Sequence, residues 1–219
     1  METININQLE AISRSLPNID IVEARVPFDI FEQITKEIEN PSKELSDFNS
    51  NLLGHIEEEY NLDHIKDSIS DYITEVARYW VQNNPGLIES QEEVRKANTW
   101  EFELDGLWVN KQKKHEFNPM HHHSGVLSFV IYINIPYDLD EEDKVFPNIS
   151  GKESYTSKFY FAYSDILGRQ RQLALPVDKN WEGIMLMFPA SLHHGVHPFY
   201  TSDEQRITVS GNIQIKVVE

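Results

Sequence analysis

The sequence predicts a mainly β protein with α-helices: an antiparallel sandwich or jelly roll with a helical N-terminal layer packed against it. Up to about residue 97, apolar residues recur at helical spacing, whereas beyond it apolar and polar residues alternate over several short segments. Strands that follow a helical half favour a sheet with helices outside it. We therefore expect one structural unit, in which residues 1–97 form a helical support region and residues 98–219 form the β core.

The N-terminal half contains one strand pattern and two helix patterns. Residues 20–26 alternate as a strand does, and Pro27 ends the pattern. Apolar residues at helical spacing predict a helix over 28–39, and the clearest apolar stripe predicts a longer helix over 62–82. The Asn-Asn-Pro-Gly sequence at 83–86 ends this second helix. We expect the apolar side chains of the second helix to belong to the core, with a cofactor-binding surface as the alternative.

The C-terminal half contains eight strand patterns. Segment 126–135 carries Leu, Phe and Ile on one face and more polar residues on the other, and segment 205–216 is divided in a similar way. Such strands suit a barrel whose outer face is covered by helices and whose interior holds a polar ligand, with a solvated polar face as the alternative. The predicted strands are 98–104, 107–113, 126–135, 158–164, 170–176, 183–188, 193–198 and 205–216.

One long connection interrupts these strands. Residues 138–156 are acidic and rich in turn-forming residues. A connection of this length in a compact domain is often a lid or a binding loop. We expect it to cover a substrate, with a plain surface loop as the alternative.

The composition excludes several classes of function. The chain has no cysteine, which rules out disulfides, zinc–thiolate sites and thiol nucleophiles. The net charge of −17 argues against binding to duplex nucleic acid. No apolar run approaches the roughly 18–20 residues of a membrane span, and the first residues lack the features of a signal peptide. We therefore expect a cytoplasmic protein without a membrane partner.

Seven of the nine histidines lie between residues 115 and 197, in two groups. In the first group, His121 and His123 share one face of an extended chain, whereas His122 faces the other way. In the second group, His194 enters a predicted strand after a turn. Two imidazoles at i and i+2 can bind one divalent ion from one side, and a distant third can complete the set. Polar core positions are the alternative for these side chains.

Arg206 lies twelve residues beyond His194 and is followed by a hydroxyl residue, Thr208. Three neutral imidazole nitrogens can hold a divalent ion and leave positions open for a chelating keto-acid. A buried arginine can then pair with the far carboxylate of that acid through two hydrogen bonds. A surface ion pair is the alternative for this arginine.

The sequence segments that carry these histidines and Arg206 resemble the Fe(II)/2-oxoglutarate-dependent dioxygenase superfamily. They are most similar to the prolyl-hydroxylase-like branch of oxygenases encoded in tailed-phage and bacterial genomes. They span about residues 100–214, half of the chain. The resemblance implies a double-stranded β-helix (jelly roll) with a helical N-terminal layer packed on the major sheet. If the protein is encoded by a phage, the resemblance implies that it is located in the cytoplasm of the host cell. The matching segments are 108–112, 117–125, 183–194 and 206–208.

The resemblance also implies a metal-ligand set. His121 and His123 match the proximal pair of ligands, and His194 matches the distal ligand. Most members have Asp or Glu where this chain has His123. Three neutral ligands leave the iron site more positive than two histidines and a carboxylate would.

Five further residues match positions around the cosubstrate of this family. Arg206 resembles the anchor of the C5 carboxylate of 2-oxoglutarate, and Thr208 resembles the hydroxyl residue of an Arg-x-Ser pattern. Gln112 stands where many members have a tyrosine that contacts the cosubstrate, and Asn110 shares its strand face. Tyr132, on the face expected to point inward, is a further candidate for the pocket.

The implied reaction uses Fe(II), 2-oxoglutarate and O2, with no catalytic residue beyond the metal centre. 2-Oxoglutarate is decarboxylated to succinate, and an acceptor is hydroxylated. A protein side chain such as proline is the first expectation for that acceptor, and a small molecule is the second. Two alternatives are a three-histidine, cupin-type metalloenzyme that does not use 2-oxoglutarate and a non-catalytic jelly roll with a structural or binding role.

Overall fold

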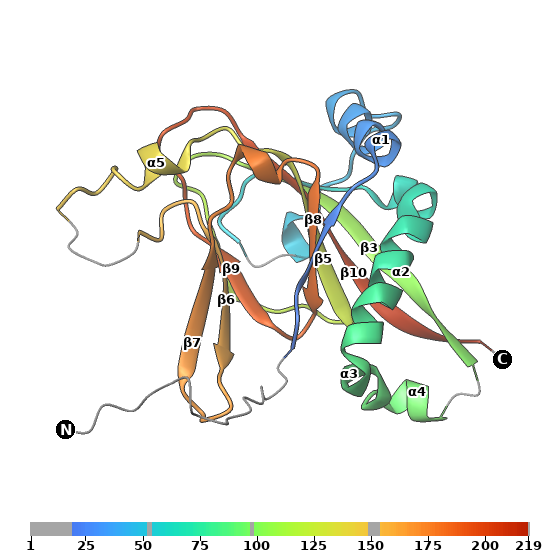
Figure 1. Cartoon of the computed structure of the whole chain (residues 1–219). Helices are drawn as coiled ribbons and strands as arrows, with labels where there is room; N and C mark the ends of the chain where they lie inside the picture. Colours follow the sequence, from blue (N-terminus) through green and yellow to red (C-terminus); the bar gives the residue numbers. More distant parts are fainter. Residues whose placement is uncertain (1–18, 52–53, 97–98, 149–153, 219) are drawn as a thin grey trace, which may run out of the picture.

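Two antiparallel sheets face each other, and helices cover the outer side of the larger one (Figure 1). The computed structural model describes residues 19–51, 54–96, 99–148 and 154–218. This arrangement confirms the predicted mainly β architecture with a helical layer on the major sheet. Within the described ranges, no helix is both long enough and apolar enough to cross a membrane.

The major sheet has six strands in the order β1-β8-β5-β10-β3-β2. Its outermost strands, β1 and β2, come from the N-terminal half of the chain, and β2 was not predicted. β3 is one long strand where two were predicted, because β10 pairs with both of its halves across a register shift between Asn212 and Ile213. The bounds are β1 (Val22–Arg25), β2 (Glu59–Asn61), β3 (Thr99–Gln112), β5 (Leu127–Asn134), β8 (Ile184–Pro189) and β10 (Arg206–Val218).

The minor sheet has four strands in the order β4-β9-β6-β7. Their bounds are β4 (Asn118–His121), β6 (Phe159–Ser164), β7 (Gln170–Leu175) and β9 (His193–Val196). The predicted strands did not include β4, although residues 121–123 were expected to be extended. This short strand pairs with β9 and places His121 directly opposite His194. The pairing therefore brings together two histidines from the two groups of the sequence.

The two longer helices pack on one side of the major sheet. The prediction for 28–39 is confirmed by α1 (Phe28–Glu39), and the prediction for 62–82 by η3 (Asp63–Ile65) with α2 (Lys66–Asn83). Pro85 ends α2 but also begins α3, because proline at a first helical position lacks only an N–H that would have no partner. The short helices, which were not predicted, are η2 (Asn49–Asn51), α3 (Pro85–Glu89), α4 (Glu92–Lys96), α5 (Leu139–Glu142) and η4 (Lys179–Trp181).

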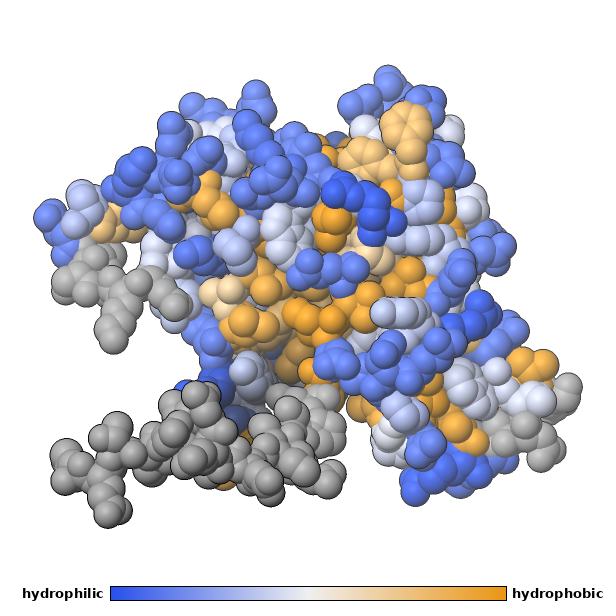
Figure 2. Space-filling model, viewed as in Figure 1, coloured by the Kyte–Doolittle hydropathy of each residue, from blue (hydrophilic) through white to orange (hydrophobic). Residues whose placement is uncertain are grey.

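The alternation of β5 divides the interior into two apolar cores. Phe129 and Ile131 point toward the helices and join a core built with residues of α1 and α2. Val130 and Tyr132 point the other way, into a smaller core between the two sheets. The predicted faces are therefore confirmed within β5, whereas Ile135, just beyond the strand, belongs to the smaller core and not to the face predicted for it. On the face seen in Figure 2, apolar side chains gather along β1 and β8 between hydrophilic margins.

Candidate metal centre

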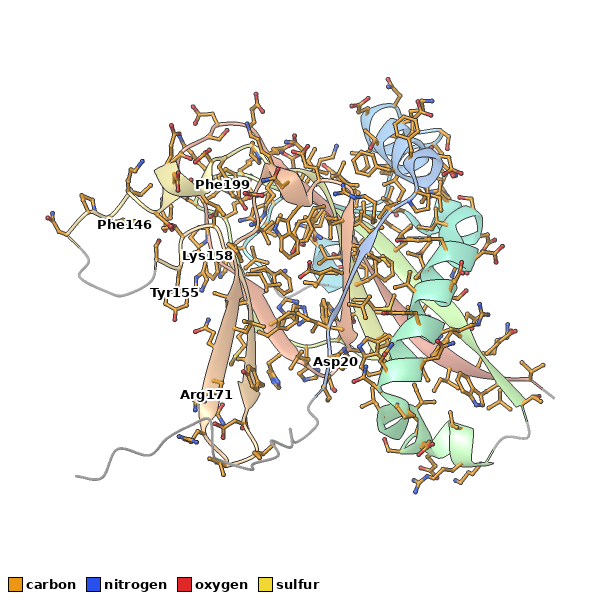
Figure 3. All side chains as sticks on the ribbon, viewed as in Figure 1. Asp20, Phe146, Tyr155, Lys158, Arg171 and Phe199 are labelled. Atoms are coloured by element: carbon orange, nitrogen blue, oxygen red, sulfur yellow. The ribbon has the colours of Figure 1, made fainter. Side chains whose placement is uncertain are left out.

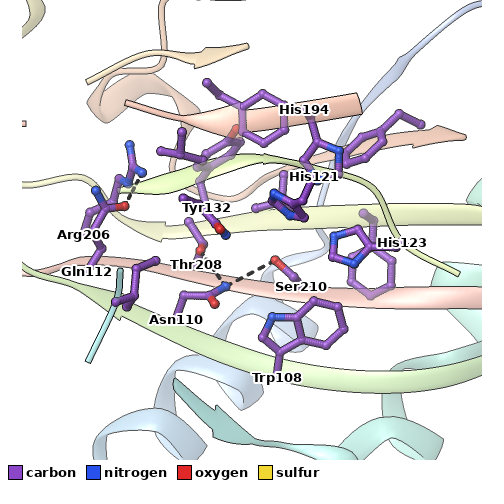
Figure 4. Close-up of a pocket in the computed structure, with 17 residues that line it drawn as sticks. Trp108, Asn110, Gln112, His121, His123, Tyr132, His194, Arg206, Thr208 and Ser210 are labelled. Carbon is purple, nitrogen blue, oxygen red and sulfur yellow. Dashed lines mark hydrogen bonds between the residues drawn. The ribbon is translucent and has the colours of Figure 1, made fainter. Parts of the chain in front are cut away.

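Three histidine side chains converge between the two sheets (Figure 4). His121 ends β4, and His194 lies opposite it on β9. The His123 amide donates to the carbonyl of Ala190 at 2.9 Å, which ties the chain after β4 to the turn that leads into β9. One ring nitrogen from each histidine lies within 4.8 Å of the others. The group therefore fits a single metal ion.

Backbone carbonyls orient two of these rings. Nδ1 of His121 lies 2.7 Å from the carbonyl oxygen of Pro119, and Nδ1 of His194 lies 2.8 Å from that of Leu192. A carbonyl oxygen can only accept, so each Nδ1 carries the hydrogen. Each Nε2 then keeps a free lone pair, which is the arrangement that metal-binding histidines use.

Burial keeps all three imidazoles neutral at pH 7. Loss of solvation, and then the neighbouring imidazoles, lower the pKa of His123 to about 4. The same causes, desolvation first, lower the pKa of His194 to about 3 and that of His121 below its ordinary value. Neutral imidazole is the form that binds metal. Imidazole donors suit iron, zinc, copper and nickel, so the residues fit Fe(II).

A buried arginine stands in the same pocket. Arg206, at the start of β10, is only 4 % exposed. Its Nη1 donates to the Tyr137 hydroxyl at 3.1 Å and to the Ser157 carbonyl at 3.0 Å, and its Nη2 donates to Oε1 of Gln112. None of these partners, within the described residues, is a carboxylate. A buried guanidinium without a counter-charge suits an anionic ligand such as the carboxylate of 2-oxoglutarate.

Polar side chains line the space between Arg206 and the histidines. Asn110 Nδ2 donates to the hydroxyls of Thr208 at 3.3 Å and Ser210 at 3.4 Å (Figure 4). The Tyr132 hydroxyl is buried and has no hydrogen-bond partner in the part of the chain that is described. Burial raises the pKa of this phenol, so it keeps its proton and can donate to a ligand oxygen.

Residues of both sheets line the pocket. Trp108 forms part of its wall, with the ring 5.6 Å from that of His123. All eight residues singled out in the sequence line it: Asn110, Gln112, His121, His123, Tyr132, His194, Arg206 and Thr208.

Several lining residues and contacts were not predicted. Trp108 and Ser210 share the inward faces of β3 and β10 with predicted residues, so strand alternation could have identified them. Tyr137 and Ser157 reach Arg206 from outside the strands, and no local pattern indicates this. Gln112 contacts Arg206 directly, so its observed contact is with the predicted anchor.

Comparisons with known proteins bear on the family and on the fold. Residues 106–212 match the model of a family described as "Putative 2OG-Fe(II) oxygenase". The fold is similar to that of a Pseudomonas putida prolyl-4-hydroxylase, with a TM-score of 0.50 and 13% identity over 89% of this chain and 91% of that one. It is also similar to SnoN, a non-heme alpha-ketoglutarate-dependent epimerase from nogalamycin biosynthesis. For SnoN, the TM-score is 0.50 and the identity 9%, over 90% of this chain and 76% of that one. No curated protein sequence matches the chain significantly.

Proposed function

We propose that this chain is a dioxygenase of the 2OG-Fe(II) oxygenase superfamily and that it hydroxylates an acceptor. Its match to the model of that family supports the proposal, and the superfamily uses Fe(II), 2-oxoglutarate and O2. In the proposed reaction, 2-oxoglutarate is decarboxylated to succinate. One oxygen atom of O2 enters succinate and the other enters the acceptor. The Fe(II) centre, when bound, supplies the activation of O2 that this oxidation needs.

The residues of the chain would bind, orient and shield the reactants. The Nε2 atoms of His121, His123 and His194 would hold the metal. Arg206 would bind the C5 carboxylate of 2-oxoglutarate, and the Tyr132 hydroxyl would donate to another oxygen of the ligand. Thr208, which accepts a hydrogen bond from Asn110, would line the same end of the pocket. These contacts would orient the cosubstrate between the guanidinium and the metal.

One observation carries the proposal. A pocket that holds three neutral imidazoles also holds a buried Arg206 whose described partners include no carboxylate. The metal and the arginine together would bring three positive charges, and 2-oxoglutarate brings two negative ones. The acid therefore complements both ends of the pocket. A three-histidine enzyme that does not use 2-oxoglutarate would leave this buried guanidinium without a role.

For the acceptor, we propose a side chain of a protein, such as proline, with a small molecule as the second candidate. Trp108 and Ile56 give the pocket wall an apolar surface that suits an aliphatic ring. The candidate acceptors are tested by mass spectrometry, in which hydroxylation adds one oxygen atom to the acceptor.

The cofactor chemistry is tested first, on protein loaded with Fe(II) without oxygen. Addition of 2-oxoglutarate should produce a visible charge-transfer band, and admission of O2 should then produce succinate. Arg206→Ala should remove the band while metal binding persists. Arg171→Ala is the matched control because Arg171 lies on the exposed strand β7. Iron binding without a band in the unaltered protein would favour the three-histidine enzyme, and no iron binding would favour a structural jelly roll.

A further inference from the structure

A fully buried glutamate lies in the most acidic connection of the chain. Glu142 ends α5 and is 0% exposed, whereas its neighbours Asp140 and Glu141 are exposed. A carboxylate is costly to bury unless hydrogen bonds compensate for the lost water. Its Oε1 accepts three: from the amides of Tyr200 at 2.9 Å and Thr201 at 2.8 Å, and from the Thr201 hydroxyl at 2.6 Å. Glu142 therefore ties α5 to the turn that precedes β10.

α5 and the turn before β10 together hold residues 156–157 in place. The backbone carbonyl of Glu142 accepts from the Thr156 hydroxyl at 2.9 Å. The amide of Ser157 donates to the carbonyl of Pro198 at 2.9 Å. Figure 3 shows Lys158 and Phe199, which adjoin these contacts, on the side of the molecule where α5 lies. Residues 156–157 are thus fastened on both sides.

Ser157 adopts an uncommon backbone conformation at this point. It is fully buried, and its φ is +61°, in the left-handed region that residues other than glycine rarely adopt. Such a conformation persists only where the surrounding contacts determine it. Its carbonyl oxygen accepts from Arg206 Nη1 at 3.0 Å and from the Tyr137 hydroxyl at 3.2 Å. The strained residue therefore contacts the guanidinium directly.

These contacts decide which N–H groups of Arg206 remain for a ligand. A guanidinium has five N–H donors. Nη1 donates to Tyr137 and Ser157, and Nη2 donates to Gln112. The Nε–H and the second Nη2–H have no partner among the described residues. Two donors on one guanidinium are what a bidentate contact with a carboxylate needs.

We propose that Glu142 is a positioning residue for the cosubstrate: it holds the Ser157 carbonyl in the place where that oxygen orients the guanidinium of Arg206. The effect on 2-oxoglutarate rests on the function proposed above. The orientation of the arginine does not. The described part of the 138–156 connection is thereby assigned to the cosubstrate end of the pocket, in addition to the covering role expected from its sequence.

The test compares four variants. Glu142→Leu removes the acceptor, whereas Glu142→Gln keeps an oxygen for the three donors and should restore binding. Thr201→Val removes one of the donors. Glu141→Gln is the matched control, on the same helix but exposed. In Fe(II)-loaded protein without oxygen, the Kd for 2-oxoglutarate should rise about tenfold in E142L and about threefold in T201V. It should stay within about twofold of the unaltered value in E142Q and E141Q, and the affinity for Fe(II) should not change.

A second readout does not require 2-oxoglutarate. In ¹⁵N NMR spectra, the Nη resonances of Arg206 should be resolved in the unaltered protein, because hydrogen bonds hinder rotation, and averaged in E142L. Unchanged Kd values and unchanged resonances in both E142L and T201V would refute the proposal. So would an equal loss of metal and 2-oxoglutarate affinity, which indicates a general structural effect. If E142L does not fold, the Kd for 2-oxoglutarate and the Arg206 resonances of T201V decide between these outcomes. An unaltered protein that binds no 2-oxoglutarate, but whose Arg206 resonances respond to these changes, would refute the proposed function and leave the positioning role intact.

Discussion

Glu59 should make the stability of the metal-free protein depend on pH. This residue of β2 is 2% exposed, and its Oε1 has no hydrogen-bond partner among the described residues. Burial, followed by the nearby charges of Glu116 and Asp47, raises the pKa of its carboxyl from 4.5 to about 7. At about 1.4 kcal/mol per pKa unit, this shift corresponds to about 3 kcal/mol.

The direction of this pH dependence follows from the protonation of Glu59 in the folded and the unfolded protein. Below pH 4.5 the Glu59 carboxyl is protonated in both the folded and the unfolded protein. The free energy of unfolding then has its full value with respect to this group. Between pH 4.5 and about 7 the unfolded chain releases this proton while the folded chain keeps it. The free energy of unfolding therefore falls as the pH rises, and the loss is complete above the folded pKa.

Glu59→Gln isolates this effect, because glutamine has a similar shape and does not titrate. Urea unfolding of both proteins at pH 4.5, 5, 6, 7 and 8 gives the free energy of unfolding of each. Relative to E59Q, the unaltered protein should lose about 3 kcal/mol between pH 4.5 and pH 8. The other titrating groups are common to both proteins and cancel in the difference. A difference that stays flat over this range, or that rises with pH, would refute the reasoning.

Three further changes have expected outcomes. His194→Ala should weaken Fe(II) binding at least about a hundredfold in anaerobic titration, whereas His193→Ala, at an exposed position, should not. In thermal unfolding, Ser157→Gly should be more stable than Ser157→Ala by about 1 kcal/mol, because only glycine adopts the positive φ without strain. Equal stabilities of the two variants would contradict the inference that the backbone is strained at residue 157. Gly211→Ala should destabilise the fold by about 1–3 kcal/mol in urea unfolding, because the new Cβ would lie 2.6 Å from the ring of Phe129. A neutral Gly211 substitution would show that the sheet adjusts there.

Local patterns predicted much of the fold because they are physical properties of single strands and helices. The apolar stripe of α2 and the alternation of β5 both depend on which residues of one element face the core. β2 and β4 were missed because each is short, with three and four residues. β4 also begins with Asn118 and Pro119, which are typical of turns. Such strands form because β3 and β9 provide their hydrogen-bond partners.

The sequence by itself determined the chemistry available to the site. Two histidines at i and i+2, a third histidine after a turn and an arginine beyond it predict a metal and an acid, because these properties belong to the side chains. Only the tertiary structure decided that the four converge, that Gln112 contacts Arg206 across 94 positions of the chain, and that Glu142 is buried. Such contacts depend on the path of the whole backbone through two sheets. No local pattern of residues records that path.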